Sequence, residues 1–175
     1  MKDLIRQKVA IQDNVINMLN KQVKLEAQSS AAYLAMAAWC DQHGFDHSAK
    51  FFYEQSNEER SHMLRLFHYL SDMGGQPMVA TVEAPQSDFS SLREVFEIAL
   101  ESEINVTESI NQIVAACRKA SDFATENFMQ WFVKEQVEEE FVARRALEFF
   151  DMLGDDPASL LIIDERILKI KYTEE

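Results

Sequence analysis

Residues 58–70, EERSHMLRLFHYL, have the spacing of an amphipathic helix with two unexpected members on its apolar side. The apolar residues recur at intervals of three and four, at Met63, Leu66, Phe67, Tyr69 and Leu70. Glu59 and His62 fall on the same stripe. A glutamate three residues before a histidine places an oxygen and a nitrogen ligand one helical turn apart. The stretch therefore predicts a helix that carries metal-binding side chains toward the core.

Glycine and proline divide the rest of the chain into long helical stretches. The four glycines and three prolines lie near residue 44, within 74–85, and at 154 and 157. Both residue types are costly inside helices, proline by about 3 kcal/mol, so the stretches between them favour helix. The sequence predicts long helices at about 9–41, 46–73, 91–118 and 123–152, and a short helix at about 157–169. Ser91 and either Ser121 or Asp122 are the expected caps of the third and fourth helices.

Helices of this length predict an all-α four-helix bundle. About 27 residues span roughly 40 Å, which suits a bundle better than an ordinary globular helix. The short first and third links predict antiparallel pairs. The link from residue 74 to about residue 90 is long enough to travel the length of the bundle, so the second and third helices should run parallel. We expect residues 1–175 to form a single domain of this crossover type.

Each long helix has a glutamate near the middle of its apolar stripe. The four are Glu26, Glu59, Glu103 and Glu139. A buried carboxylate is costly unless it is neutralised or paired. One such residue has ordinary explanations, either a misjudged exposed position or a buried salt bridge. The nearby basic residues fall on other helix faces; these are Lys24, Arg60 and Lys134. Four inward glutamates with one histidine therefore favour a metal site, and these ligand types suit iron, manganese or zinc.

The composition excludes several classes of partner. Asp and Glu outnumber Lys and Arg by 30 to 17, which gives a net charge of −13. This charge disfavours nucleic acid and anionic lipid and attracts cations. No stretch approaches the roughly 20 apolar residues of a membrane span, and the N-terminal residues lack the apolar core of a signal peptide. The two cysteines, Cys40 and Cys117, are expected to be free thiols in a reducing cytoplasm.

Three segments resemble the ferritins, and within them the bacterial non-haem ferritins. They are KLEAQSSAAYLAMAAWC at 24–40, NEERSHMLRLFHYL at 57–70 and MQWFVKEQVEEE at 129–140. The resemblance extends from about residue 14 to about residue 169, and includes the long crossover and the short last helix. It implies a ferritin-like domain that stores iron and oxidises Fe²⁺ at a centre within each chain.

The resemblance also implies a role for each residue of the site. Ligands of the first iron would be Glu26, Glu59 and His62. Glu59 would bridge to a second iron held by Glu103 and Glu139, with Gln136 beside it. Tyr33 matches the tyrosine next to the family's centre, and Trp131 is a second nearby aromatic residue. A third iron on the inner surface would be held by residues that match Glu58, Glu135, Glu138 and Glu139.

Departures from related families narrow this interpretation. Bacterioferritins and rubrerythrins carry a second Glu-x-x-His, which helix 123–152 lacks. Arg60 stands where bacterioferritins have their haem-binding methionine, so no haem is expected. The family further implies a hollow shell of twenty-four copies, with O₂ or H₂O₂ as oxidant and a ferric mineral inside. Asp122 and Glu126 are candidates for an iron-entry channel.

Three other classes remain open on the sequence alone. A di-iron oxidoreductase that does not store iron would use the same ligands on a separate substrate. A structural or protein-binding bundle would leave the four glutamates without a purpose. A DNA-protecting mini-ferritin would place its iron site between subunits and would lack the last helix.

Overall fold

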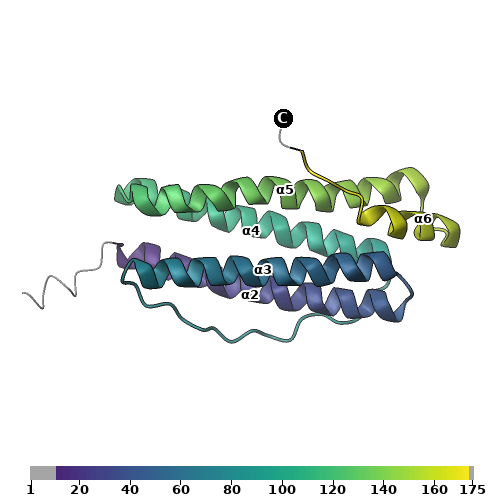
Figure 1. Ribbon diagram of the computed structural model, residues 1–175, viewed down its shortest axis with the longest axis horizontal. Coiled ribbons are helices and arrows are strands. Elements are labelled where there is room, and N and C mark those ends of the chain that lie inside the picture. The colour runs from purple at the N-terminus through teal and green to yellow at the C-terminus, as the bar shows by residue number, and fades with distance from the viewer. Residues whose placement is uncertain (1–10, 174–175) are drawn as a thin grey trace, which may run out of the picture.

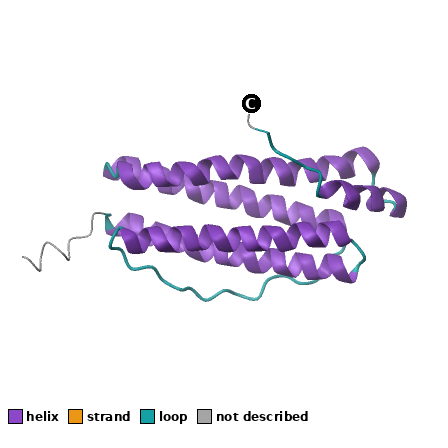
Figure 2. Cartoon of the chain, viewed as in Figure 1, coloured by secondary structure: helices purple, strands orange, loops and turns teal. Residues whose placement is uncertain are grey.

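Four long helices lie side by side, and a short helix packs at one end of them (Figures 1 and 2). The computed structural model describes residues 11–173, and this range contains no strand. The helices are α2 (Asp13–Gln42), α3 (Asp46–Asp72), α4 (Leu92–Ala120), α5 (Phe123–Leu153) and α6 (Pro157–Ile167). This confirms the predicted all-α bundle. The expected start at residue 9 falls outside the described residues, and α6 ends two residues before the expected position. Within the described range, no helix is long and apolar enough to cross a membrane.

The helices end where turn and capping chemistry dictates. Gly44 and Gly74 adopt positive φ angles of 79°, a backbone conformation that favours glycine. The Ser91 hydroxyl accepts a hydrogen bond of 3.1 Å from the Glu94 N–H at the start of α4. Asp122 caps α5 in the same way by accepting from the Thr125 N–H at 3.1 Å. The predicted cap at Ser91 and the alternative at Asp122 are both confirmed.

The segment between α3 and α4 runs along the outside of α2 for much of the bundle's length (Figure 1). The buried Asn20 fastens its first part. The Asn20 Nδ2 donates to the Gln76 carbonyl at 3.0 Å, and the Met78 N–H donates to Asn20 Oδ1 at 2.8 Å. The crossover therefore has fixed contacts with the helices, and it makes α3 and α4 parallel as the sequence predicted.

Two apolar cores fill the two ends of the bundle and leave a polar layer between them. One core lies beside α6 and includes Phe52, Phe96, Phe150 and Ile163. The other lies at the opposite end and includes Leu19, Leu66, Ile110 and Phe132. Each such side chain stabilises the fold by about 1.5–3 kcal/mol when fully buried. These two cores hold the helices rigidly on both sides of the polar layer.

A pair of serines fixes how α2 and α3 lie along each other. The Ser30 hydroxyl donates to the Ser56 carbonyl at 2.7 Å, and the Ser56 hydroxyl donates to the Ser30 carbonyl at 2.8 Å. A shift of one helix along the other would break both bonds. The exchange therefore sets the axial register of the two helices, close to the polar layer.

Helix α6 packs on its own bundle through one face. Ile163 and Ile167 are fully buried in the neighbouring core. Asp164 accepts hydrogen bonds from the backbone N–H groups of His47 at 3.1 Å and Ser48 at 2.8 Å, at the start of α3. A carboxylate at a helix N-terminus satisfies free N–H groups and complements the helix dipole. One apolar face of α6 is thus buried against its own bundle.

Candidate metal centre

The polar layer gathers acidic side chains from all four long helices. Glu26 comes from α2, Glu59 and His62 from α3, Glu103 from α4, and Gln136 and Glu139 from α5. All six side chains are buried, with at most 5% of any residue exposed. Among the described residues, no Lys or Arg forms an ion pair with any of the four glutamates. This removes both ordinary explanations for them, exposure and a buried salt bridge.

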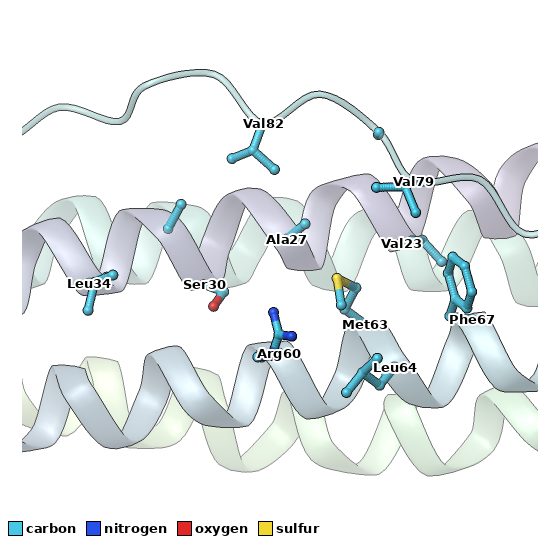
Figure 3. A pocket seen from close by; sticks show the side chains of 12 residues that line it. Val23, Ala27, Ser30, Leu34, Arg60, Met63, Leu64, Phe67, Val79 and Val82 are labelled. Atoms are coloured by element: carbon cyan, nitrogen blue, oxygen red, sulfur yellow. The ribbon is translucent and has the colours of Figure 1, made fainter.

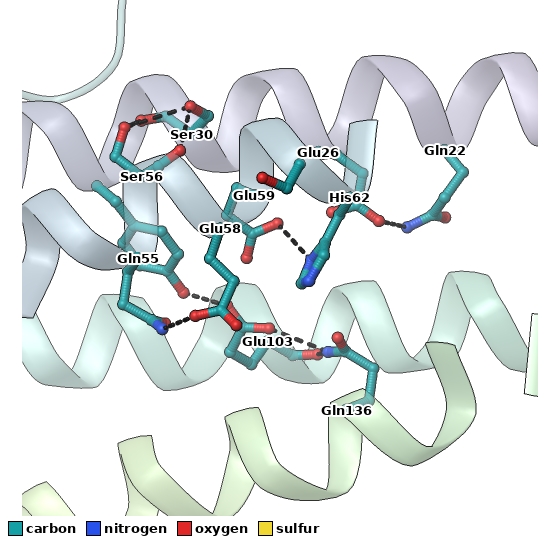
Figure 4. A network of polar contacts seen from close by, with 12 residues as sticks. Gln22, Glu26, Ser30, Gln55, Ser56, Glu58, Glu59, His62, Glu103 and Gln136 are labelled. Atoms are coloured by element: carbon teal, nitrogen blue, oxygen red, sulfur yellow. Dashed lines mark hydrogen bonds and ion pairs between the residues drawn. The ribbon is translucent and has the colours of Figure 1, made fainter. Parts of the chain in front are cut away.

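Glu26, Glu59 and His62 form the most compact group in the layer. One ligand atom from each lies within 4.8 Å of the other two. The Glu59 Oε2 and His62 Nδ1 are 3.5 Å apart (Figure 4), and Glu26 Oε1 accepts a bond of 2.9 Å from Gln22 Nε2. The Oε2 atoms of Glu26 and Glu59 are buried and accept no hydrogen bond from any described residue, and the Glu59 Oε2 is the same oxygen that lies 3.5 Å from His62 Nδ1. Such oxygens are costly unless a cation binds them, so this group fits a metal ion.

Glu103 and Glu139 lie on the α4–α5 side of the layer. The Tyr33 hydroxyl donates to Glu103 Oε1, and the Gln136 Nε2 donates to Glu103 Oε2 at 3.0 Å. Within the described residues, these two glutamates do not join any three-ligand group as tight as that of Glu59 and His62. These two glutamates therefore lie near the centre without forming a compact three-ligand group. The Glu103 carboxylate instead accepts hydrogen bonds from Tyr33 and Gln136.

A second compact group faces outward from the layer. Glu58, His62 and Glu135 bring ligand atoms within 4.8 Å of one another. Glu58 is exposed and Glu135 is half-buried, so this group opens toward solvent. Glu138 is exposed and lies outside the group, although the resemblance placed it with Glu58 and Glu135. His62 belongs to both compact groups, and it therefore links the buried and the open side of the centre.

Two aromatic residues border the centre. The Tyr33 ring is buried and stacks on Phe52 with a centroid separation of 5.8 Å. The Trp131 ring meets His62 edge to face at 5.4 Å, and the Arg65 guanidinium lies 4.1 Å from the centroid of the Trp131 ring. These rings restrict how His62 and the glutamates can turn.

The crowded carboxylates hold protons strongly while no cation is bound. Burial, and then the negative charge of Glu59, raises the pKa of Glu26 well above its ordinary value. Burial also raises the pKa of Glu59 and that of Glu139 well above the ordinary value. The pKa of Glu103 is raised to a lesser degree, because hydrogen bonds from Tyr33 and Gln136 oppose the effect of burial there. A divalent cation would replace these protons and make burial of the carboxylates favourable.

The sequence interpretation missed three polar residues that touch the centre. Gln22 is fully buried and donates to Glu26, and Ser109 donates to the Gln22 Oε1. Thr107 accepts a bond of 3.3 Å from Gln136 Nε2. Gln22 lies four residues before Glu26 and so on the same helix face, which was a usable signal. Nothing local marks Thr107 or Ser109, because their partners lie on other helices.

The bundle and its buried carboxylate–histidine layer define a class of protein, the metal-binding carboxylate four-helix bundles. A family model described as the ferritin-like domain matches residues 16–152, so the chain belongs to the ferritin-like family. The resemblance to the ferritins is thereby confirmed, and relatives named bacterial non-heme ferritins confirm the narrower likeness.

Individual relatives agree with this assignment over nearly their whole length. A Haemophilus influenzae protein described as a probable bacterial non-heme ferritin-like protein is 41% identical over 155 residues, which cover 89% of this chain and 94% of the relative. A bacterial non-heme ferritin of Escherichia coli is 38% identical over 157 residues, covering 90% and 95%. The structure of an open-pore ferritin from Archaeoglobus fulgidus superposes with a TM-score of 0.88 at 34% identity, covering 93% of this chain and 100% of that one.

Proposed function

We propose that this protein stores iron and that its polar layer is a ferroxidase centre. The observation that carries the proposal is the pair of buried oxygens of Glu26 and Glu59 that accept no hydrogen bond, beside His62. Membership of the ferritin-like family, and relatives named bacterial non-heme ferritins, make Fe²⁺ the cation that best suits this site. Carboxylate and imidazole are suitable ligands for iron.

Two Fe²⁺ ions bind in the centre as substrates. The first is held by Glu26, Glu59 and His62. The second is held by Glu59, Glu103 and Glu139, with Gln136 beside it. With O₂ as oxidant, two Fe²⁺ and two protons give two Fe³⁺ and one H₂O₂; with H₂O₂ as oxidant, the same ions and protons give two Fe³⁺ and two H₂O. Carboxylates stabilise Fe³⁺ more than Fe²⁺, which favours this oxidation.

The residues around the two ions hold the ligands in place and provide a route by which iron leaves the buried pair. Tyr33 holds Glu103 through its hydroxyl. A third iron binds at the open side of the centre, where Glu58 and Glu135 lie close to His62. Glu138 and Glu139 complete its proposed set of ligands. Because this group is partly exposed, it provides a step between the buried pair and the surface at which ferric mineral grows. No haem is required for this chemistry.

The stored mineral requires an enclosed space, so we propose a homo-oligomeric shell of twenty-four copies in the cytoplasm. An apolar groove of about 550 Å³ between α2, α3 and the crossover supports contact between copies (Figure 3). Its exposed side chains include Leu34, Val79 and Val82, and contiguous exposed apolar surface marks interaction sites. Asp122 and Glu126 remain proposed entry-channel residues, although Asp122 also caps α5 and Glu126 pairs with Arg118 at 2.7 Å.

The alternative function is a di-iron oxidoreductase that does not store iron. The same buried ligands would serve it. The measurement that separates the two is iron accumulation, because an oxidoreductase turns over a separate substrate and retains only its bound pair.

Anaerobic titration with Fe²⁺, followed by admission of air, tests the proposal. We expect two to three tight sites per chain, then oxidation and growth of a soluble ferric core well beyond that ratio. The variant Glu103→Gln should slow oxidation, while Glu101→Gln, an exposed glutamate on the same helix, should match the unaltered protein. Two sites without accumulation would favour the oxidoreductase, and the absence of tight sites would overturn the metal centre itself.

A further inference from the structure

Two hydroxyl groups of α4 contact two buried amides on opposite sides of the centre. Thr107 contacts Gln136 of α5, and Ser109 contacts Gln22 of α2. Each amide in turn reaches a glutamate of the centre, since Gln136 donates to Glu103 and Gln22 donates to Glu26. The two hydroxyls lie two residues apart, which on a helix directs them to nearly opposite faces.

The two hydrogens of Gln136 Nε2 are shared among three acceptors, of which the Glu103 Oε2 at 3.0 Å is the nearest. The backbone carbonyl of Glu103 can only accept, and it lies 3.2 Å from Gln136 Nε2. The Thr107 hydroxyl donates its hydrogen to Glu140 Oε1 at 2.7 Å, so toward Gln136 it can only accept. Arg144 holds the other Glu140 oxygen at 2.7 Å. The side of the amide that faces Glu103 and Thr107 must therefore be its NH₂ group.

This arrangement leaves the Gln136 Oε1 free. No hydrogen bond from the described residues reaches that atom, and in Figure 4 it lies on the side of the amide toward His62. An amide with the opposite orientation would present N–H groups to a cation and repel it. We propose that Thr107 is a positioning residue of the centre, which fixes the Gln136 amide with its oxygen toward the second metal ion. Ser109 has the corresponding role on the other side of the centre, where it fixes the Gln22 amide so that its Nε2 donates to Glu26.

This inference rests on the proposed function and adds the residue that orients Gln136, the neutral side chain beside the second ion. Outer partners of metal ligands typically change metal affinity 10- to 100-fold when removed. Thr107→Val removes the hydroxyl at nearly constant shape, and Thr107→Ser restores it. Ser109→Ala is the matched control, because it removes a hydroxyl of the same helix that serves the other side.

Titration of the metal-free full-length protein with Co²⁺, followed by its visible absorption, measures the two positions separately. We expect Thr107→Val to bind the second Co²⁺ 10- to 100-fold more weakly with a changed spectrum, and the first Co²⁺ unchanged. Thr107→Ser should bind both ions within about threefold of the unaltered protein. Ser109→Ala should weaken only the first ion. Equal weakening of both ions by Thr107→Val, or none, would overturn the inference.

A crystal structure of metal-free Thr107→Val tests the same point without any metal. The Gln136 amide should be rotated, or should occupy two orientations. A single amide orientation unchanged from the unaltered protein would overturn the inference, whatever the metal affinities. Failure of the unaltered protein to bind Co²⁺ or Fe²⁺ would instead reject the proposed function, and the crystallographic result would still decide the role of Thr107.

Discussion

Replacement of Glu26 by glutamine tests whether the buried carboxylates destabilise the metal-free protein. Burial and the neighbouring charge of Glu59 raise the pKa of Glu26 well above its ordinary value. A carboxyl group with a raised pKa binds its proton more tightly in the folded chain than in the unfolded chain. The free energy of unfolding therefore falls as pH rises above the ordinary glutamate pKa, and the full penalty is present only above the raised value.

The expected size of the effect follows from the local contacts. Replacement of a buried ion pair by well-packed neutral side chains of similar volume is often neutral or stabilises a protein by about 1–4 kcal/mol, and we expect removal of one of several crowded carboxylates to have an effect of the same order. Glutamine keeps the oxygen that accepts from Gln22, and its NH₂ group supplies a donor near the unpartnered Glu59 Oε2. We expect metal-free Glu26→Gln to gain stability in this range at pH 7, which raises the melting temperature by about 2–4 °C per kcal/mol.

Thermal unfolding in EDTA at equal protein concentration, at pH 7 and pH 5, measures this gain. The gain should be smaller at pH 5, because the pKa of Glu26 is raised by burial and the penalty of the folded carboxylate shrinks as pH falls toward the ordinary glutamate pKa. With saturating Co²⁺, the unaltered protein should melt at a higher temperature than Glu26→Gln, because it binds the ion more tightly and is therefore stabilised more. Glu101→Gln should shift the free energy by no more than about 0.5 kcal/mol. A Glu26→Gln protein that melts below the unaltered protein at pH 7 in EDTA would refute the reasoning.

Three further predictions concern other parts of the molecule. Tyr33→Phe should retain both Co²⁺ sites but slow Fe²⁺ oxidation measured by stopped-flow absorbance, because the hydroxyl that holds Glu103 is lost; unchanged oxidation would reject a role for this hydroxyl. Burial raises the pKa of Cys40 to about 12 and that of Cys117 to about 11, so at pH 8 neither thiol should react with a disulfide reagent until the chain unfolds, and prompt reaction of the native protein would contradict this. Asp164→Ala should cost about 1–3 kcal/mol, by leaving the N–H groups of His47 and the buried Ser48 without their partner. It should speed hydrogen exchange in the first turn of α3 and in α6, and exchange like that of a Glu165→Ala control would disprove the anchoring role.

The helices were predictable because their ends depend on local chemistry. Gly44 and Gly74 permit backbone angles that other residues rarely adopt, and Ser91 caps α4 through a residue only three positions away. The inward orientation of the four glutamates was predictable for the same reason. Helical periodicity alone places each on an apolar stripe, and the structure buries all four.

Features that depend on contacts between distant segments were not predictable. In α5, apolar residues are adjacent in sequence at 142–143 and at 149–150, and the structure buries Ala143 and Phe150 more deeply than Val142 and Phe149. Adjacent apolar residues satisfy the periodicity equally well, and only packing against other helices decides between them. The Asp164 cap joins segments 116 or 117 residues apart. No local sequence pattern predicts such a hydrogen bond.

The crossover that separates α3 from α4 divides the centre between two helical hairpins. Glu26, Glu59 and His62 belong to the α2–α3 hairpin, whose register is set by the exchange between Ser30 and Ser56. The other ligands belong to α4–α5. Each hairpin closes over a short link, whereas docking of the two must close a much longer loop, so we expect docking to come later in folding. Ions bound across both hairpins therefore form their last contacts late, and such contacts slow unfolding more than they speed folding. Iron bound at the proposed centre would thus govern how long a folded chain lasts, in addition to being its cargo.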